Sequence, residues 1–350
     1  MNVKIGISFD GFSTFSETLE IAKQSEIFGM KSLWMAQHMG YREAIVTSTS
    51  FLMATNKIKV VPTAISPYLW HPTPTAMSLA TMAEATPGRV GVAIGIGNPL
   101  FLQESGAKLV KPLRVVREYI EVLQALWSGD QVYHDGFLYK IEGARMAFKP
   151  QKPIQIYIAA IKDGMLSLSG RLSDGVVLSA GLSSAFVRRS LDIVDQSLTK
   201  YDREQKKFTR AGFLFFASSK NGKEAIDVLR SKLAFTLRNR FLDDNINFSG
   251  IPINQGKIID AVARRNLDEA QKLVPDEAVE AFTIGGTPSQ CRDQLNKFIE
   301  AGLNEVVLMM VGTKRQKAFS LSVGLEFIDS VIKAHSKNFN NQKIITSKEN

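Results

Sequence analysis

The segment SLWMAQHMGYREAIVTSTSFLMATNKIKVVPTAI, residues 32–65, decides the fold. Its apolar start, Ser32–Met35, predicts a strand, Glu43–Thr55 predicts a helix, and Ile58–Ile65, rich in β-branched residues, predicts a second strand. Two strands joined by a crossover helix lie parallel in one sheet, because the helix returns the chain to the end where it started. The segment is therefore one strand–helix–strand unit of a parallel α/β fold.

The same alternation extends over the rest of the chain. The predicted strands are Val3–Ser8, Ser32–Met35, Ile58–Ile65, Arg89–Ile96, Ile154–Ala159, Gly175–Ser179, Gly212–Ala217 and Glu305–Met310. Eight strands, each followed by a helix, predict a closed (β/α)8 TIM barrel with insertions. The alternative is an open doubly wound sheet with a second domain. No linker rich in Pro, Gly or Ser divides the chain, which favours one domain over residues 1–335 and a polar, flexible tail at 336–350.

Several helices show characteristic starts or apolar stripes. Thr14 and Glu17 form a capping-box pattern, and Pro72 and Pro74 begin a helix at Thr73–Thr86. The other predicted helices are an amphipathic helix from Leu113 to Trp127, Gly164–Leu172, Ser184–Tyr201, Thr287–Ala301 and a closing helix marked by Leu321, Leu325, Ile328 and Ile332. Helical segments are also predicted from Lys223 to Val274, broken by a loop at Asp243–Gln255. The remaining predicted segments are an irregular stretch, Gly97–Lys111, and a hairpin, Gln131–Ile141, that turns at Asp135-Gly136.

Composition limits the possible locations and partners. The single cysteine, Cys291, rules out an internal disulfide, fits a reducing compartment and is expected to be a small buried residue. No apolar run approaches the roughly 20 residues needed to cross a bilayer, and the N-terminus lacks a signal-peptide pattern. The net charge of +9 is scattered rather than gathered in a basic stripe. We therefore expect a cytoplasmic protein that binds neither membrane nor nucleic acid.

The chemistry of a parallel barrel gathers just after the carboxyl ends of its strands. The candidate positions there are Ser8, Asp10, Gln37, His38, Thr63, Ala64, Ile65, Gly97, Asn98, Ala159, Ala160, Ile161, Lys162, Asp163, Gly164, Met165 and Ser179. Of these, Ser8, Asp10 and Ser179 are assigned to a substrate pocket.

His38 is the candidate for proton chemistry, because histidine can hold or deliver a proton near neutral pH. A hydrogen-bonded structural histidine is an equally open alternative from position alone. His71, before Pro72, is expected to be structural, and His134 and His335 are expected to be solvated. Four dispersed histidines and one cysteine give no metal-ligand spacing, so no metal is expected.

Two segments suggest how a cofactor could be held. Gly95-x-Gly97 lacks the third glycine of a dinucleotide fingerprint, and its glycines would instead let the main chain approach a flat ring. Ala159–Met165 ends a strand and begins a helix, so its N–H groups and Lys162 could bind an anion such as phosphate. An ordinary strand-to-helix turn is the alternative.

The order and spacing of several motifs resemble the bacterial luciferase-like superfamily, nearest to its coenzyme F420-dependent branch of methylenetetrahydromethanopterin reductases and F420-dependent dehydrogenases. The motifs are Ser32-Leu33-Trp34-Met35-Ala36-Gln37-His38, Ser66-Pro67-Tyr68-Leu69-Trp70-His71-Pro72, Pro87-Gly88-Arg89 through Gly95-Ile96-Gly97, Lys111-Pro112-Leu113-Arg114-Val115-Val116-Arg117-Glu118, Leu126-Trp127-Ser128-Gly129-Asp130, Gly143-Ala144-Arg145-Met146, Ile156-Tyr157-Ile158-Ala159-Ala160, Met165 through Gly170, Asp174-Gly175-Val176 and Ile284-Gly285-Gly286-Thr287-Pro288. The resemblance covers roughly residues 1–335 and implies a luciferase-like barrel.

The resemblance also implies a cofactor arrangement. A deazaflavin ring would lie across the barrel mouth, backed by a non-proline cis peptide at Thr63–Ala64, and the cofactor phosphate would lie at Ala160–Gly164. His38 would face the ring, while Gln37 and Asn98 would hydrogen-bond the ring or the substrate. A homo-oligomer, such as a dimer, is expected by the same resemblance.

Three positions depart from the family pattern. Ser8, Gln37 and Asn98 stand where relatives carry carboxylates, and carboxylates near a reacting centre usually move protons. Neither relative's substrate is therefore assigned to this chain. The leading hypothesis is an F420-dependent oxidoreductase that moves hydride to or from a small organic substrate. The alternatives are an FMN-dependent monooxygenase that uses reduced flavin and oxygen, and a non-catalytic barrel that binds a cofactor.

Overall fold

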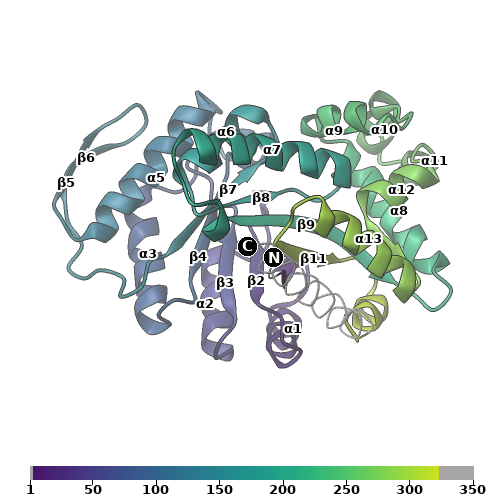
Figure 1. Cartoon of the computed structure of the whole chain (residues 1–350), viewed down its shortest axis with the longest axis horizontal. Helices are drawn as coiled ribbons and strands as arrows, with labels where there is room; N and C mark the ends of the chain where they lie inside the picture. The colour runs from purple at the N-terminus through teal and green to yellow at the C-terminus, as the bar shows by residue number, and fades with distance from the viewer. Residues whose placement is uncertain (1–2, 323–350) are drawn as a thin grey trace, which may run out of the picture. The chain divides into compact units, whose positions relative to one another are not determined.

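The computed structural model describes residues 3–322 (Figure 1), and the chain divides into two compact units. The N-terminal unit consists of residues 6–177 and 193–209, and the C-terminal unit of residues 3–5, 178–192 and 210–322. The tail predicted to be flexible, His335 and all but the start of the predicted closing helix lie outside the described residues.

The N-terminal unit is built on parallel strands, and the first residues of β1 and the last of β8 are in the C-terminal unit. They are β1 (Lys4–Phe9), β2 (Ser32–Ala36), β3 (Lys59–Thr63), β4 (Gly91–Ile94), β7 (Gln155–Ala160) and β8 (Gly175–Leu178). Ser8 pairs with Trp34, Trp34 with Val61, and Ala93 with Tyr157. Single bridges at Val60–Val90 and Ile65–Ile94 link β3 to the neighbourhood of β4. These strands are almost wholly buried, as expected of parallel strands covered on both faces.

Helices follow these strands and begin as the sequence predicts. They are α1 (Phe15–Ile27), α2 (Ala44–Ala54), α3 (Pro72–Ala85), α5 (Pro112–Ser128) and α6 (Asp163–Leu172). The capping box at Thr14 and Glu17 is present, which confirms that prediction. The prediction that His71 is structural is also confirmed, because its Nδ1 accepts the N–H of Thr73 at the start of α3.

The region between β4 and β7 differs in part from the prediction. Gly97–Lys111 was expected to be irregular, yet it contains the short helix α4 (Pro99–Glu104). Asn98 caps this helix and Pro99 occupies its first turn, a favourable start that the expectation overlooked. The hairpin prediction is confirmed by β5 (Val132–Asp135) and β6 (Lys140–Ala144), which stand beside α5 in Figure 1.

The C-terminal unit contains β9 (Thr209–Ser218), paired in parallel with β11 (Glu305–Met310) and with the short β10 (Ile284–Gly286). Helix α7 (Ser184–Lys200) begins in this unit and ends in the other, before a 3-10 turn at Gln205–Lys207. The remaining elements are α8 (Lys223–Leu237), a 3-10 turn at Arg240–Leu242, α9 (Asp243–Ser249), α10 (Gln255–Ala263), α11 (Leu267–Lys272), α12 (Asp276–Phe282) and α13 (Pro288–Glu300).

The prediction of a loop at Asp243–Gln255 is wrong for the first half of this segment. Residues 243–249 form α9, which carries Asp243 and Asp244 in its first turn, where negative charge stabilises a helix. Gly250, with φ of 69°, ends the helix, so only the next few residues are irregular. Cys291 is fully buried, as predicted, and burial raises the pKa of its thiol to about 12.

Candidate cofactor site

The carboxyl ends of β2, β3, β4 and β7 bring most of the predicted site residues together. The N–H of Gln37 donates to the carbonyl of Thr63 (2.7 Å), and the N–H of Gly95 donates to the carbonyl of Ile65 (3.2 Å). The main chain after β2 therefore adjoins the end of β3, and the end of β3 adjoins β4.

Gly95 occupies a narrow position among small side chains. A Cβ atom added to Gly95 would lie 3.0 Å from the Cβ of Ala64 and 3.0 Å from the Cβ of Ala159. These three residues, from β4, the end of β3 and β7, are called the small-residue cradle below. The cradle gathers predicted cofactor residues with no bulky side chain among them, so a flat ring could approach its main chain closely.

Large buried rings lie one layer deeper along the same strands. Trp34 and Tyr157 are fully buried, with ring centroids 5.0 Å apart. Tyr157 pairs with Ala93, two residues before Gly95, so it shares the face of the cradle. Small residues at the strand ends thus rest on a packed aromatic layer.

The peptide bond between Thr63 and Ala64 is cis, which confirms the prediction made for the end of β3. Next along the chain, Ile65 pairs with Ile94 in a parallel bridge. Gly97 adopts a φ of 85°, a conformation that favours glycine, and an added Cβ there would lie 3.1 Å from Oγ of Ser66.

Ser8 carries a buried hydroxyl near the carboxyl end of β1. The residue is 9% exposed, and its Oγ has no hydrogen-bond partner in the described chain. A buried hydroxyl without a partner is costly, which suits a group reserved for a ligand. Asp10 is engaged, because its Oδ1 accepts the N–H of Phe12 (3.0 Å).

His38 is half-buried and lies beside two other rings. Its ring centroid is 5.3 Å from that of Phe12, and Phe12 is 4.3 Å from Tyr41. The structure therefore places His38 in a ring cluster after β1 and β2. Whether it faces a cofactor stays a prediction.

Gln37 and Asn98 have structural tasks that the sequence reasoning missed. Oε1 of Gln37 accepts the N–H of Ala44 (2.7 Å) at the start of α2, and Oδ1 of Asn98 accepts the N–H of Leu100 (2.9 Å). The amide NH2 groups are the atoms through which both residues could contact a ligand. The Asn98-Pro99 pair was the sequence signal for the second cap.

Ala159–Met165 forms the predicted strand-to-helix turn, with α6 beginning at Asp163. The N–H groups of Met165 and Leu166 both donate to the carbonyl of Lys162 (3.0 Å each). An added Cβ at Gly164 would lie 3.0 Å from Leu113, so the first turn of α6 packs closely against α5. Anion binding at this turn stays a prediction.

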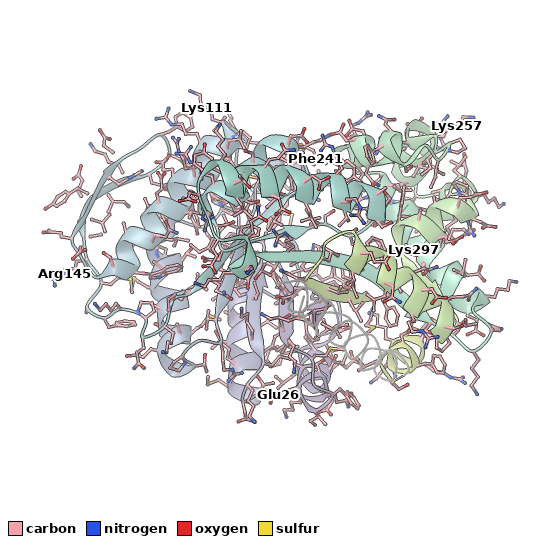
Figure 2. The ribbon with its side chains drawn as sticks, viewed as in Figure 1. Glu26, Lys111, Arg145, Phe241, Lys257 and Lys297 are labelled. Carbon is pink, nitrogen blue, oxygen red and sulfur yellow. The ribbon has the colours of Figure 1, made fainter. Side chains whose placement is uncertain are left out.

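Basic side chains gather at the amino end of α5. Nζ of Lys111 lies 4.8 Å from the centre of the Phe137 ring, and the guanidinium carbon of Arg114 lies 5.1 Å from it. Figure 2 labels Lys111 at this end of α5. Because Leu113 touches the start of α6, these charges would favour an anion near that turn.

Ser179 lies in the C-terminal unit, where its hydroxyl donates to the carbonyl of Ala180 (3.2 Å). Its assignment to a substrate pocket stays a prediction. Among the described residues, no group of three His, Cys, Asp or Glu side chains could hold a metal ion. No helix in residues 3–322 is long and apolar enough to cross a membrane.

A buried carboxylate on α5 binds the hairpin, and the sequence reasoning missed this contact. Glu118, 4% exposed on α5, accepts the N–H groups of Phe137, Leu138 and Tyr139. Its Oε1 also lies 3.1 Å from Nε2 of His134. The prediction that His134 is solvated is therefore wrong, because a buried carboxylate 16 residues upstream binds its ring.

The hairpin in turn contacts the segment that follows the cis peptide. The hydroxyl of Tyr139 donates to the carbonyl of Pro67, and its ring meets that of His71 edge-on at 5.5 Å. Tyr68, the neighbour of Pro67, donates its hydroxyl to the carbonyl of Val110 (2.7 Å). The chain between β3 and α3 is thus held from both sides.

We expect Tyr139→Phe to weaken cofactor binding several-fold, because the loop after β3 loses its bond at Pro67. Tyr119→Phe is the matched control, since this equally buried hydroxyl bonds Thr75 inside α3 instead (2.8 Å). Each variant should lose about 1 kcal/mol of unfolding free energy. Equal cofactor affinities for the two variants would show that the Pro67 bond does not position the site.

The chain matches known proteins over most of its length. The model of the family described as luciferase-like monooxygenase matches residues 5–305. The chain is 28% identical over 336 residues to 5,10-methylenetetrahydromethanopterin reductase of Archaeoglobus fulgidus, covering 93% of this chain and 99% of the relative. It is 22% identical over 320 residues to F420-dependent glucose-6-phosphate dehydrogenase of Gordonia bronchialis, covering 86% and 89%.

A solved structure shows the same fold. The coenzyme F420-dependent tetrahydromethanopterin reductase of Methanopyrus kandleri superposes with a TM-score of 0.81 at 24% identity, covering 88% of this chain and 93% of that one. The predicted (β/α)8 barrel is confirmed, and the open doubly wound alternative is wrong.

Proposed function

Because the chain belongs to the luciferase-like monooxygenase family, we propose that it is a coenzyme F420-dependent oxidoreductase that transfers hydride to or from an organic substrate. The small-residue cradle is the observation that carries this proposal. Only main chain and methyl groups line it at Ala64, Gly95 and Ala159, as a flat deazaflavin ring requires. Ser8 is on β1, separated from β3 by β2, and its Oγ has no hydrogen-bond partner among the described residues, which fits a ligand that brings polar atoms to this end of the strands.

When bound, coenzyme F420 supplies the carbon atom that gives or takes the hydride. The protein fixes the main chain around the cradle through the hairpin and the loop after β3. The strand-to-helix turn at 160–164, with the basic end of α5 nearby, would hold the cofactor's anionic part. Gln37 and Asn98 would donate hydrogen bonds from their amide groups while their oxygens cap helices.

The substrates named for the relatives are not assigned to this chain. The side chains of Ser8, Gln37 and Asn98 are a hydroxyl and two amides, so these positions provide no carboxylate for proton transfer. His38 is the titratable side chain that we propose for holding or delivering the proton that accompanies hydride transfer to a carbonyl acceptor.

The test is a side-by-side titration of the purified protein with coenzyme F420 and with FMN. Tight binding of F420 without oxygen consumption supports the proposal. FMN binding with oxygen uptake in the presence of reduced FMN would replace it with a monooxygenase. Binding of F420 without any hydride transfer to a broad set of acceptors would indicate a non-catalytic barrel.

We expect His38→Gln to slow the oxidation of reduced F420 by the quinone menadione about tenfold, because glutamine cannot deliver the proton that accompanies the hydride. F420 affinity should stay within twofold of wild type, since the cradle is untouched. Stopped-flow absorbance measures the rate, and fluorescence titration measures the affinity. An unchanged rate would remove His38 from the reaction.

We further propose that two copies of the chain associate through α2 and α3, which pack against each other. Helix α2 carries no charged residue and exposes Val46 and Met53, and α3 exposes Met77 beside it. Chains with a net charge of +9 can meet at an uncharged face with little repulsion. Met53→Arg should convert a dimer to a monomer in light scattering, and Ile27→Arg, at an exposed site on α1, should not.

We propose a cytoplasmic location, because the single, fully buried Cys291 can form no internal disulfide and suits a reducing compartment.

A further inference from the structure

Two loops of the N-terminal unit present an exposed group of rings. Phe12 follows β1, and His38 and Tyr41 follow β2; these three residues are called the aromatic rim below. Ring centroids are 5.3 Å apart for Phe12 and His38, and 4.3 Å apart for Phe12 and Tyr41. Although the rings contact one another, Phe12 is 48% exposed and Tyr41 is 52% exposed.

The main chain under the aromatic rim is fixed. The carboxylate of Asp10 accepts the N–H of Phe12 (3.0 Å), and Nη1 of Arg42 donates to the carbonyl of Gly11 (3.1 Å). The N–H of Tyr41 donates to the carbonyl of His38 (3.3 Å). Arg42 thus ties the loop after β2 to the loop after β1. Exposed rings held in this way are pre-organised for a ligand that covers them.

The aromatic rim lies next to the proposed cofactor position. His38 directly follows Gln37, whose N–H bonds the carbonyl of Thr63 at the end of β3. Ala64, the next residue, belongs to the small-residue cradle. A molecule stacked on the rim would therefore lie beside a ring held in the cradle.

The charges around the rim restrict the ligand. The carboxylate of Asp10 is engaged by Phe12, and that of Glu43 accepts the N–H groups of Ile45 and Val46. Arg42 is the charged basic side chain that joins the two loops. A cationic ligand would find no carboxylate without a backbone partner on these two loops, whereas a neutral or anionic one could accept hydrogen bonds from the guanidinium of Arg42.

We propose that the aromatic rim is the substrate subsite and that it binds planar aromatic or heteroaromatic molecules that are uncharged or anionic. This inference rests on the proposed function, because the cradle is taken to hold the cofactor. A flat aromatic ring gains binding free energy by stacking on Phe12 and Tyr41, whereas a saturated ring of the same charge gains less binding free energy.

The experiment compares two probes, 2-naphthoate and cyclohexanecarboxylate, by calorimetric titration of the full chain loaded with F420. Each carries one carboxylate, but only the first is planar. We expect 2-naphthoate to bind more tightly, and Phe12→Leu to weaken it about tenfold. The matched control is Phe28→Leu, because Phe28 is 47% exposed at the end of α1 and should leave the affinity unchanged. Thermal unfolding verifies that both variants are folded.

Three results would overturn the inference. The two probes could bind equally, Phe12→Leu could leave 2-naphthoate binding unchanged, or Phe12→Leu could dissociate a dimer, which would assign the rim to contact between copies. Failure of F420 to bind wild type would count against the proposed function instead. In that case the same 2-naphthoate comparison on the unloaded chain still tests the rim.

Discussion

Gly95→Leu is expected to reduce the affinity for coenzyme F420 at least about a hundredfold, equivalent to roughly 2.7 kcal/mol of binding free energy. Even one added carbon at this position would lie 3.0 Å from both Ala64 and Ala159. The rest of a leucine side chain must then extend into the space that the ring would occupy, or displace the strands that form the cradle. Fluorescence titration with F420 measures the loss.

The control for this prediction is Gly256→Leu in α10, where the nearest atom to an added Cβ is Oδ1 of Asn254 at 3.6 Å. Circular dichroism and thermal unfolding must show that Gly95→Leu retains its fold. If Gly95→Leu does not fold, Gly95→Ala is used instead, and it should lower the affinity for F420 by a smaller factor. Wild-type affinity in a folded Gly95→Leu protein would show that the ring does not lie against β4.

Glu118→Ala is expected to lower the free energy of unfolding by about 3 kcal/mol, because it removes a buried charge together with its hydrogen bonds. The N–H groups of Phe137, Leu138 and Tyr139 would lose their acceptor, and His134 would lose its partner. Urea unfolding at neutral pH measures the change. Glu121→Gln, on the exposed face of the same helix, should change stability by less than about 0.5 kcal/mol.

The same carboxylate should produce a pH dependence. Burial raises the pKa of Glu118, but the three N–H donors and His134 outweigh burial and hold it below its ordinary value. A lowered pKa stabilises the folded protein fully above the unfolded-state value of about 4.3, and this stability is lost as the pH falls through the folded-state pKa. Wild type should therefore lose more stability than Glu118→Gln on acidification below about pH 4. Parallel losses would contradict this assignment.

The strand–helix units could be predicted from sequence because their evidence is local. The β-branched run at 58–65 and the capping box at Thr14 each lie within a few residues. The cis peptide at Thr63–Ala64 was predicted from the family resemblance rather than from physics, since its neighbours specify no isomer.

The structural features that the sequence did not predict were missed for two physical reasons. Helix α4 has a local signal in Asn98-Pro99, but its six residues are too few for a periodic pattern. The partners of Glu118 and Tyr139 are distant in sequence, so composition and spacing contain no information about them. Residue type likewise could not reveal that Gln37 uses its oxygen to begin α2.

The binding of three consecutive hairpin N–H groups by one carboxylate has a consequence for local dynamics. Because one carboxylate accepts all three N–H groups of residues 137–139, loss of that acceptor exposes them to solvent in one event rather than one at a time. The hairpin can then open as a cooperative sub-global unit, whose amide protons exchange at a common free energy below that of complete unfolding. Since Tyr139 belongs to this unit, each opening would also release Pro67, and the loop after β3 would then depend on the bond between Tyr68 and Val110.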